Sequence, residues 1–165
     1  MIKKEINIRI TEVANTEELT AEERELVLAS QEMTANAYAP YSGFFVGAAV
    51  LLGNGEIVTG SNQENAAYPS GLCAERVAVF AASSRFPGVP MRMVAISTKT
   101  SVAEMSHPVA PCGACRQVIL EYEELQQKPI RLLLSSETGK TIIVERIRDL
   151  LPLAFSGKAL RNTRP

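Results

Sequence analysis

The sequence is poor in cysteine and has no surplus of basic charge. It contains three cysteines among 165 residues, no tryptophan, and 17 Lys and Arg against 18 Asp and Glu, for a net charge of −1. An odd number of cysteines argues against a disulfide framework. A protein that binds polynucleotides usually carries a basic surplus or a clustered basic face. The composition therefore favours a small neutral ligand over a nucleic acid.

Long apolar runs are also missing. No stretch approaches the roughly 18 residues that a membrane-spanning helix needs, and the opening "MIKKEINIRITEV" alternates charged and aliphatic residues rather than forming a signal-peptide core. We therefore expect a cytoplasmic protein with no membrane partner. Thiols stay reduced in that compartment, so the cysteines are expected to be inert, metal-bound or catalytic.

The order of elements predicts one α/β domain spanning residues 1–165, with about five strands layered against helices. Asn54-Gly55 is the favoured two-residue signal for a hairpin, and Thr20 with Glu23 forms a possible capping box at a helix start. The expected strands are 5–13, two within 44–62, 91–98, 130–136 and 140–147. The expected helices are 20–40, 70–84, 112–125 and 147–155.

All three cysteines fall at the expected N-termini of helices. The pair in "PCGAC", Cys112 and Cys115, could be a redox couple, part of a metal site or two buried thiols, and its spacing does not decide between these. Cys73 begins another helix, and a helix N-terminus lowers the pKa of a thiol. Three facing thiolates form a soft ligand set suited to Zn²⁺, and three ligands leave the open fourth position of a catalytic site.

Charged residues adjoin these cysteines. Glu75 stands two residues after Cys73, where a carboxylate can reach a water at the metal without binding the metal itself. The alternative role for Glu75 is a favourable charge at a helix N-terminus. Arg76 and Arg116 follow the motifs directly and could offset excess thiolate charge through hydrogen bonds to sulfur, or could simply be solvated.

"CAE" at 73–75 and "PCGAC" at 111–115 match the zinc nucleobase deaminase pattern. The sequence further resembles the small tetrameric cytidine deaminases, over roughly residues 25 to 157. The resemblance rests on several motifs in the correct order: "APYSGFFVGAAVL", "GSNQENAAYPSGLCAERVAVFAA", "PCGACRQVILEY" and "DLLPLAF".

This resemblance implies a three-layer α/β/α sandwich with a mixed central sheet. It implies one zinc per chain on Cys73, Cys112 and Cys115, with Glu75 as the proton shuttle. The implied reaction is hydrolytic deamination of cytidine and deoxycytidine to uridine and deoxyuridine with release of ammonia, a step of pyrimidine salvage.

The resemblance also implies a substrate site. Asn62 and Glu64 match a pair that hydrogen-bonds the ribose hydroxyls, and a free carboxylate there would repel a 5′-phosphate. Phe44 matches an aromatic residue that packs against the pyrimidine, and Ala74 could offer its backbone N–H to the base. The implied partner is a small pyrimidine nucleoside.

Two aromatic residues imply assembly, by resemblance alone. Phe155 matches a residue that reaches a neighbouring subunit's pocket, and Tyr68 matches one near the subunit interface, so a homotetramer with shared active sites is implied. The chain departs from the pattern at Phe45, where many relatives have Pro, and at Ser156, where Gly is common.

Three features lie outside the family pattern. Residues 1–20 form an N-terminal extension for which an extra edge strand and a flexible arm are both possible. Residues 158–165 are expected to form a loose tail. His107, the one histidine, is expected to be exposed in a loop rather than to bind metal.

Several other functions stay open at this point. A related enzyme could deaminate a modified cytosine nucleoside antibiotic, and nucleic-acid-editing deaminases share the zinc motif. A structural zinc protein would need a fourth protein ligand. A thioredoxin-like protein would leave Cys73 and Glu75 unexplained.

Overall fold

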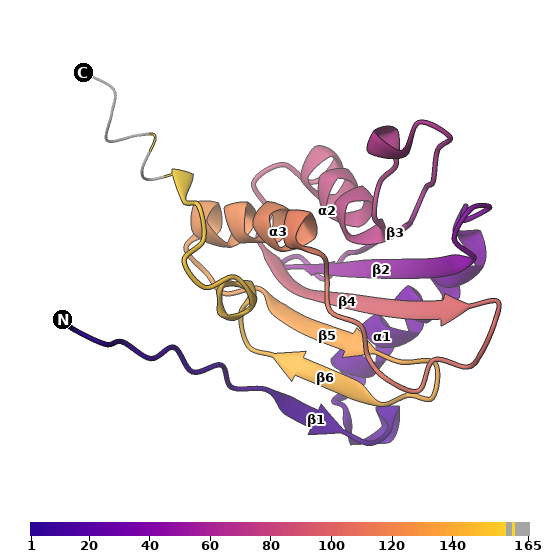
Figure 1. Cartoon of the computed structure of the whole chain (residues 1–165), viewed down its shortest axis with the longest axis horizontal. Helices are drawn as coiled ribbons and strands as arrows, with labels where there is room; N and C mark the ends of the chain where they lie inside the picture. The colour runs from indigo at the N-terminus through magenta and orange to yellow at the C-terminus, as the bar shows by residue number, and fades with distance from the viewer. Residues whose placement is uncertain (158–159, 161–165) are drawn as a thin grey trace.

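A computed structural model describes residues 1–157 and 160. They fold around one mixed sheet of six strands, drawn in Figure 1. The strand order is β1-β6-β5-β4-β2-β3. β4 and β5 run parallel, and the other neighbouring strands are antiparallel. The strands are β1 (Thr11–Val13), β2 (Phe44–Leu52), β3 (Ile57–Ser61), β4 (Met91–Thr100), β5 (Arg131–Ser135) and β6 (Thr141–Val144).

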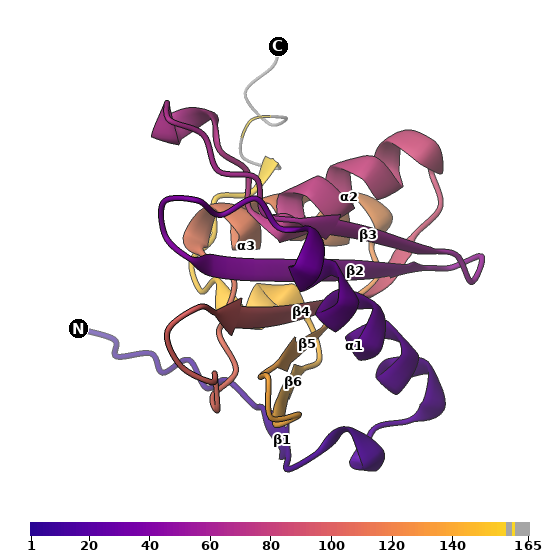
Figure 2. The same cartoon turned by 90° about the vertical axis from the view of Figure 1, so that its right-hand side faces the viewer.

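Helices cover both faces of this sheet. α1 (Ala21–Met33) lies on one face, and α2 (Ala74–Arg85) and α3 (Gly113–Gln126) lie on the other (Figure 2). The three-layer α/β/α sandwich is therefore confirmed, with six strands rather than about five. Within residues 1–157 and 160, no helix combines the length and apolarity needed to cross a bilayer.

The central strands are apolar on both faces because both faces are covered. Along β4, Val94 and Ile96 join the core under α2 and α3, whereas Met93 and Ala95 join the core under α1. This alternation matters for the site, because the next residue on the α2–α3 face is Thr98, at the carboxyl end of the strand.

Local signals placed several elements correctly. Thr20 and Glu23 form the expected capping box at the start of α1. The expected hairpin joins β2 to β3, and Gly55 adopts a positive φ of 88° in its turn.

The expected helix over 147–155 is wrong. Only a 3-10 turn forms, over Ile147–Leu150. Pro152 disfavours helical backbone in the residue before it, and Leu153 has a φ of 56°. The expected strand over 5–13 forms only at β1, which pairs with β6 at the edge of the sheet. The expected tail at 158–165 lies outside the described residues, apart from Leu160.

Gly60 lets α2 lie directly on β3. A Cβ atom at this position would stand 2.6 Å from the backbone nitrogen of Ala78 and 3.0 Å from the carbonyl oxygen of Ala74. Both atoms belong to the backbone of α2, so neither can rotate aside. The first turn of α2 is therefore held against the sheet at a distance that only glycine permits.

We predict that Gly60→Ala lowers the free energy of unfolding by about 3 kcal/mol, because the helix must move to admit one methyl group. The measurement is urea denaturation followed by circular dichroism. Gly113→Ala is the matched control, since nothing lies within 4 Å of its Cβ position and alanine suits a helix better than glycine. Equal stability of the two variants would contradict the prediction.

Candidate functional site

Two helix N-termini bring the three cysteines together. Cys73 is the N-cap residue of α2, Cys112 is the N-cap residue of α3, and Cys115 lies in the first turn of α3. The Sγ atoms of Cys73 and Cys112 are 3.9 Å apart, and those of Cys112 and Cys115 are 3.5 Å apart. All three cysteines are free, because a disulfide requires sulfur atoms about 2.05 Å apart.

The sulfur spacing fits a tetrahedral metal ion. Zn–S bonds of about 2.3 Å place sulfurs about 3.8 Å apart in a tetrahedron, and the three Sγ atoms lie within 4.8 Å of one another. Their soft donor character suits zinc. The trio could therefore hold a metal ion and leave a fourth position facing the cleft.

Hydrogen bonding shifts the pKa values of Cys73 and Cys115 in opposite directions. The Cys115 thiol and the Arg76 guanidinium both hydrogen-bond the sulfur of Cys73, which lowers the pKa of Cys73 to about 5. The Nη2 atom of Arg76 stands 3.7 Å from that sulfur. The bond to Cys73 and burial raise the pKa of Cys115. A bound dication would displace the remaining thiol protons.

Glu75 lies beside this trio, with 5% of its surface exposed. Burial raises the pKa of its carboxyl group, and the negative charge on Cys73 raises it further. A buried carboxyl group with a raised pKa in a cleft is a candidate general acid or base.

A cleft of about 670 Å³ opens in front of the cysteines and Glu75. Its floor comes from β2 and the end of β4, and its walls come from the segments before α2 and α3. The lining residues discussed below are Phe44, Val46, Asn62, Glu64, Tyr68 and Thr98. The cleft is of the size that small-molecule sites usually have.

The side chain of Asn62 extends the pairing between β2 and the chain after β3. Its Oδ1 accepts from the N–H of Val46 at 2.8 Å, and its Nδ2 donates to the carbonyl of Phe44 at 2.9 Å. The amide is therefore fixed in orientation at the edge of the cleft.

Glu64 is anchored to the Ala-Pro-Tyr-Ser segment at the cleft entrance. It accepts hydrogen bonds from the hydroxyl of Ser42 and from the N–H groups of Tyr41 and Ser42. The bond from the Ser42 hydroxyl, and then that from Tyr41, lowers the pKa of the Glu64 carboxyl. The cleft therefore has an ionised carboxylate at its rim.

The remaining candidates divide between the cleft and the outer surface. Phe44 lines the cleft, and Ala74 is fully buried as the first residue of α2. Tyr68 is 73% exposed and packs edge-on against Tyr41. Phe155 is 61% exposed and is not among the residues that line the cleft. His107 is exposed, as expected.

Arg116 does not have the expected place beside sulfur. Its Nε donates to the carbonyl of Pro111 at 2.7 Å, and its Nη1 donates to the carbonyl of Leu150 at 2.8 Å. The prediction that it donates to a thiolate is therefore wrong for the described contacts. Its guanidinium donates to backbone carbonyl groups instead. These two hydrogen bonds connect the "PCGAC" segment to the 3-10 turn near the C-terminus.

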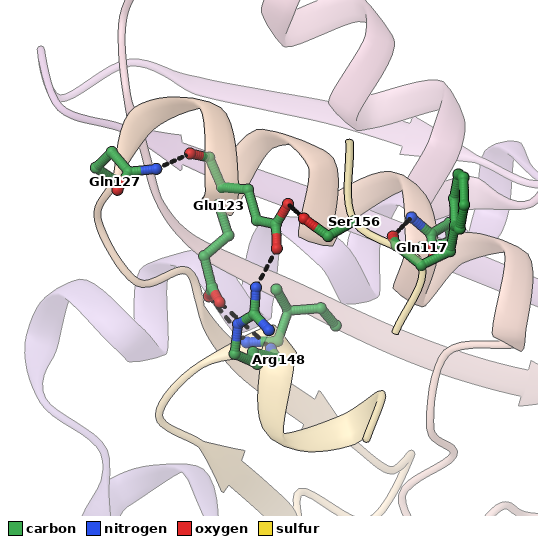
Figure 3. Close-up of polar contacts among 8 residues, drawn as sticks. Gln117, Glu123, Gln127, Arg148 and Ser156 are labelled. Carbon is green, nitrogen blue, oxygen red and sulfur yellow. Dashed lines mark hydrogen bonds and ion pairs between the residues drawn. The ribbon is translucent and has the colours of Figure 1, made fainter. Parts of the chain in front are cut away.

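The chain segment that carries Phe155 is fixed to α3. Ser156 donates to Glu124 at 2.7 Å, and Gln117 donates to the carbonyl of Phe155 at 2.9 Å (Figure 3). Arg148 forms an ion pair with the other carboxylate oxygen of Glu124, Oε1. The serine that replaces the expected glycine therefore contributes a bond that positions this segment.

Residues 20–127 match the family model described as the cytidine and deoxycytidylate deaminase zinc-binding region. The chain belongs to this family. It is thus a deaminase with the motif cysteines and Glu75 inside the matched region.

Curated relatives and solved structures agree with this assignment. The cytidine deaminase of Sporosarcina psychrophila is 40% identical over 136 residues, which is 82% of this chain and 92% of the relative. A crystal structure of cytidine deaminase from Burkholderia pseudomallei has a TM-score of 0.68 at 38% identity, over 79% of this chain and 97% of that chain. One from Mycobacterium tuberculosis has a TM-score of 0.64 at 35% identity, over 83% and 99%.

Among the cleft residues that the sequence analysis did not identify, Thr98 has an unusual environment. Thr98 is 4% exposed and lines the cleft, and its Oγ1 is buried with no hydrogen-bond partner within the described part of the chain. The sequence signal that could have identified Thr98 is the alternation of the strand. Thr98 follows Ile96 by two residues and therefore lies on the same face of β4. A buried hydroxyl without a partner destabilises the free protein.

We predict that Thr98→Val leaves the free energy of unfolding unchanged or raises it by about 1 kcal/mol, because the variant removes an unsatisfied hydroxyl and keeps the shape. Thr141→Val is the matched control. The buried Oγ1 of Thr141 bonds Ser135 and the carbonyl of Gly139, so its loss should lower stability by about 1 kcal/mol. Chemical denaturation checks both variants, and an equal loss in both would contradict the prediction.

Proposed function

We propose that this deaminase hydrolyses cytidine and deoxycytidine to uridine and deoxyuridine, releasing ammonia for pyrimidine salvage. The observation that carries the proposal is a buried Glu75 beside three sulfurs spaced for zinc, at the end of a nucleoside-sized cleft. Cys73, Cys112 and Cys115 would hold one zinc ion per chain.

When bound, zinc supplies a water whose pKa falls to about 7. Glu75 takes a proton from the attacking water and gives it to ring N3 of the pyrimidine, while the water oxygen adds at C4. Glu75 then takes the hydroxyl proton of this adduct and gives it to the departing amine. Its raised pKa suits both transfers, and such shuttling contributes about 10²–10⁴-fold in rate.

Four residues would select the nucleoside. Glu64 and Asn62 would bind the ribose hydroxyls, and the Glu64 carboxylate would repel a 5′-phosphate. Phe44 would pack against the pyrimidine ring. Ala74, as the first residue of α2, has an N–H outside the hydrogen bonding of the helix and would donate it to the base.

The whole chain would act as one catalytic domain within a homotetramer. In this arrangement Phe155, exposed and held on α3, would enter a neighbouring subunit's cleft, and Tyr68 would lie near the same interface. Arg76 would balance part of the thiolate charge through its contact with Cys73. The free thiols suit a reducing compartment, so we propose the cytoplasm.

We predict that Glu75→Gln retains about one zinc per chain and lowers kcat for cytidine by at least about 10²-fold, because the amide cannot carry the proton. Metal analysis and ammonia release are the measurements. Glu121→Gln, an exposed carboxylate on α3, is the control and should keep full activity. Unchanged turnover in Glu75→Gln would refute the shuttle, and a metal-free protein with a Cys112–Cys115 disulfide would support a redox function.

A panel of cytidine, deoxycytidine, cytidine monophosphate and blasticidin tests the substrate class. We expect turnover of both nucleosides and a kcat/KM at least about tenfold lower for the monophosphate, because like charges meet at Glu64. Glu64→Gln should reduce the ratio of kcat/KM for cytidine to kcat/KM for cytidine monophosphate, although it should also weaken ribose binding. Deamination of blasticidin alone would overturn the proposal.

A further inference from the structure

The N-terminal arm, residues 1–10, has an apolar row that its own chain leaves exposed. The arm runs from β1 away from the rest of the molecule (Figure 1). Ile6, Ile8 and Ile10 are 60%, 46% and 47% exposed. The family match begins at residue 20, so the arm lies outside the matched deaminase region.

In extended chain, alternate residues share a face. If β1 continued as extended chain toward the N-terminus, the three isoleucines would lie on one face together with Glu12 of β1. Glu12 stands opposite Ile142 of β6, and Ile142 packs against the core under α2 and α3. In that arrangement the isoleucine row would lie on the same face of the sheet as Ile142.

The edge of the sheet at β1 is free to pair with a further strand. β1 ends the strand order, and within the described residues only β6 pairs with it. Proteins normally shield such edges with charges, proline or short strands. β1 is short, but it continues into alternating isoleucines. That pattern suits pairing with another strand.

The sequence "KEINIRITE" of residues 4–12 is complementary to itself when reversed. In an antiparallel pair of two copies centred on Ile8, Ile8 faces the partner's Ile8 and Ile6 faces the partner's Ile10. Lys4 then faces the partner's Glu12, so opposite charges meet at both ends of the apolar row. A ladder centred on Asn7 would instead place Lys4 against the partner's Ile10.

We propose that residues 4–12 pair with the same segment of a second copy of this chain, as an antiparallel ladder at the edge formed by β1. The two sheets would join through this ladder, with six isoleucines on one face. Glu12 already lies 3.2 Å from Lys140 of its own chain, and the partner's Lys4 would approach the same carboxylate. The proposal is independent of the chemistry in the cleft.

Charge exchange tests the register in the full chain. We expect Lys4→Glu and Glu12→Lys each to raise the concentration for half-dissociation at least tenfold in sedimentation velocity, and the double variant to restore it. Ile8→Asp should halve the mass of the assembly. Deamination should be unchanged in all of them, since these residues lie outside the cleft and the ladder is a contact separate from the one that Phe155 and Tyr68 would make. The proposal would be overturned if the double variant dissociated as readily as the single variants. It would also be overturned if Ile8→Asp and the parent protein had equal masses.

Cross-linking tests the same register directly. Opposed residues in an antiparallel pair have Cα atoms about 4.5–5.5 Å apart, within the range of a disulfide. Ile8→Cys should therefore link two chains under mild oxidation. Lys3→Cys is the control, because its counterpart would lie about 30 Å away along the ladder. Equal cross-linking of the two variants, or none in Ile8→Cys, would also overturn the proposal.

Discussion

The close approach of three sulfur atoms requires α2 and α3 to pack at fixed positions on one sheet, and the geometry of the cleft depends on that packing. The sulfur atoms of Cys73, Cys112 and Cys115 lie within 4.8 Å of one another. Nothing local forces this, because Cys73 and Cys112 stand 39 residues apart. The packing of two helices on one sheet holds them, and the absence of a side chain at Gly60 sets how near α2 can lie.

α3 connects the cysteine cluster to the C-terminal part of the chain. Its first turn carries two of the sulfurs, and Arg116 in that turn reaches the carbonyl of Leu150. Near its end, Glu123 accepts from the N–H groups of Ile130 and Ile147. The segment that carries Phe155 therefore takes its position from the same helix that positions the sulfurs. A displacement of α3 would disturb both.

Sequence reasoning succeeded where the signal was local and failed where a distant partner decided the outcome. The Thr20 capping box, the Asn54-Gly55 hairpin and the cysteines at helix N-termini depend on neighbouring residues, and each was predicted. The role of Arg116 was not, because its partner Leu150 lies in a turn formed much later in the chain. Thr98 was missed because only tertiary packing shows that its hydroxyl has no partner among the residues that the structure describes.

The hydrogen bonding of Asn62 limits which residues can replace it at the edge of the cleft. Its side chain replaces a backbone pairing partner of β2, because Oδ1 accepts from the N–H of Val46 and Nδ2 donates to the carbonyl of Phe44. An aspartate there would set an oxygen against the carbonyl of Phe44, so the strand would be disrupted before any new substrate could be selected. Laboratory evolution toward altered nucleosides is therefore better directed to positions without such backbone bonds, and Thr98 is the first of them.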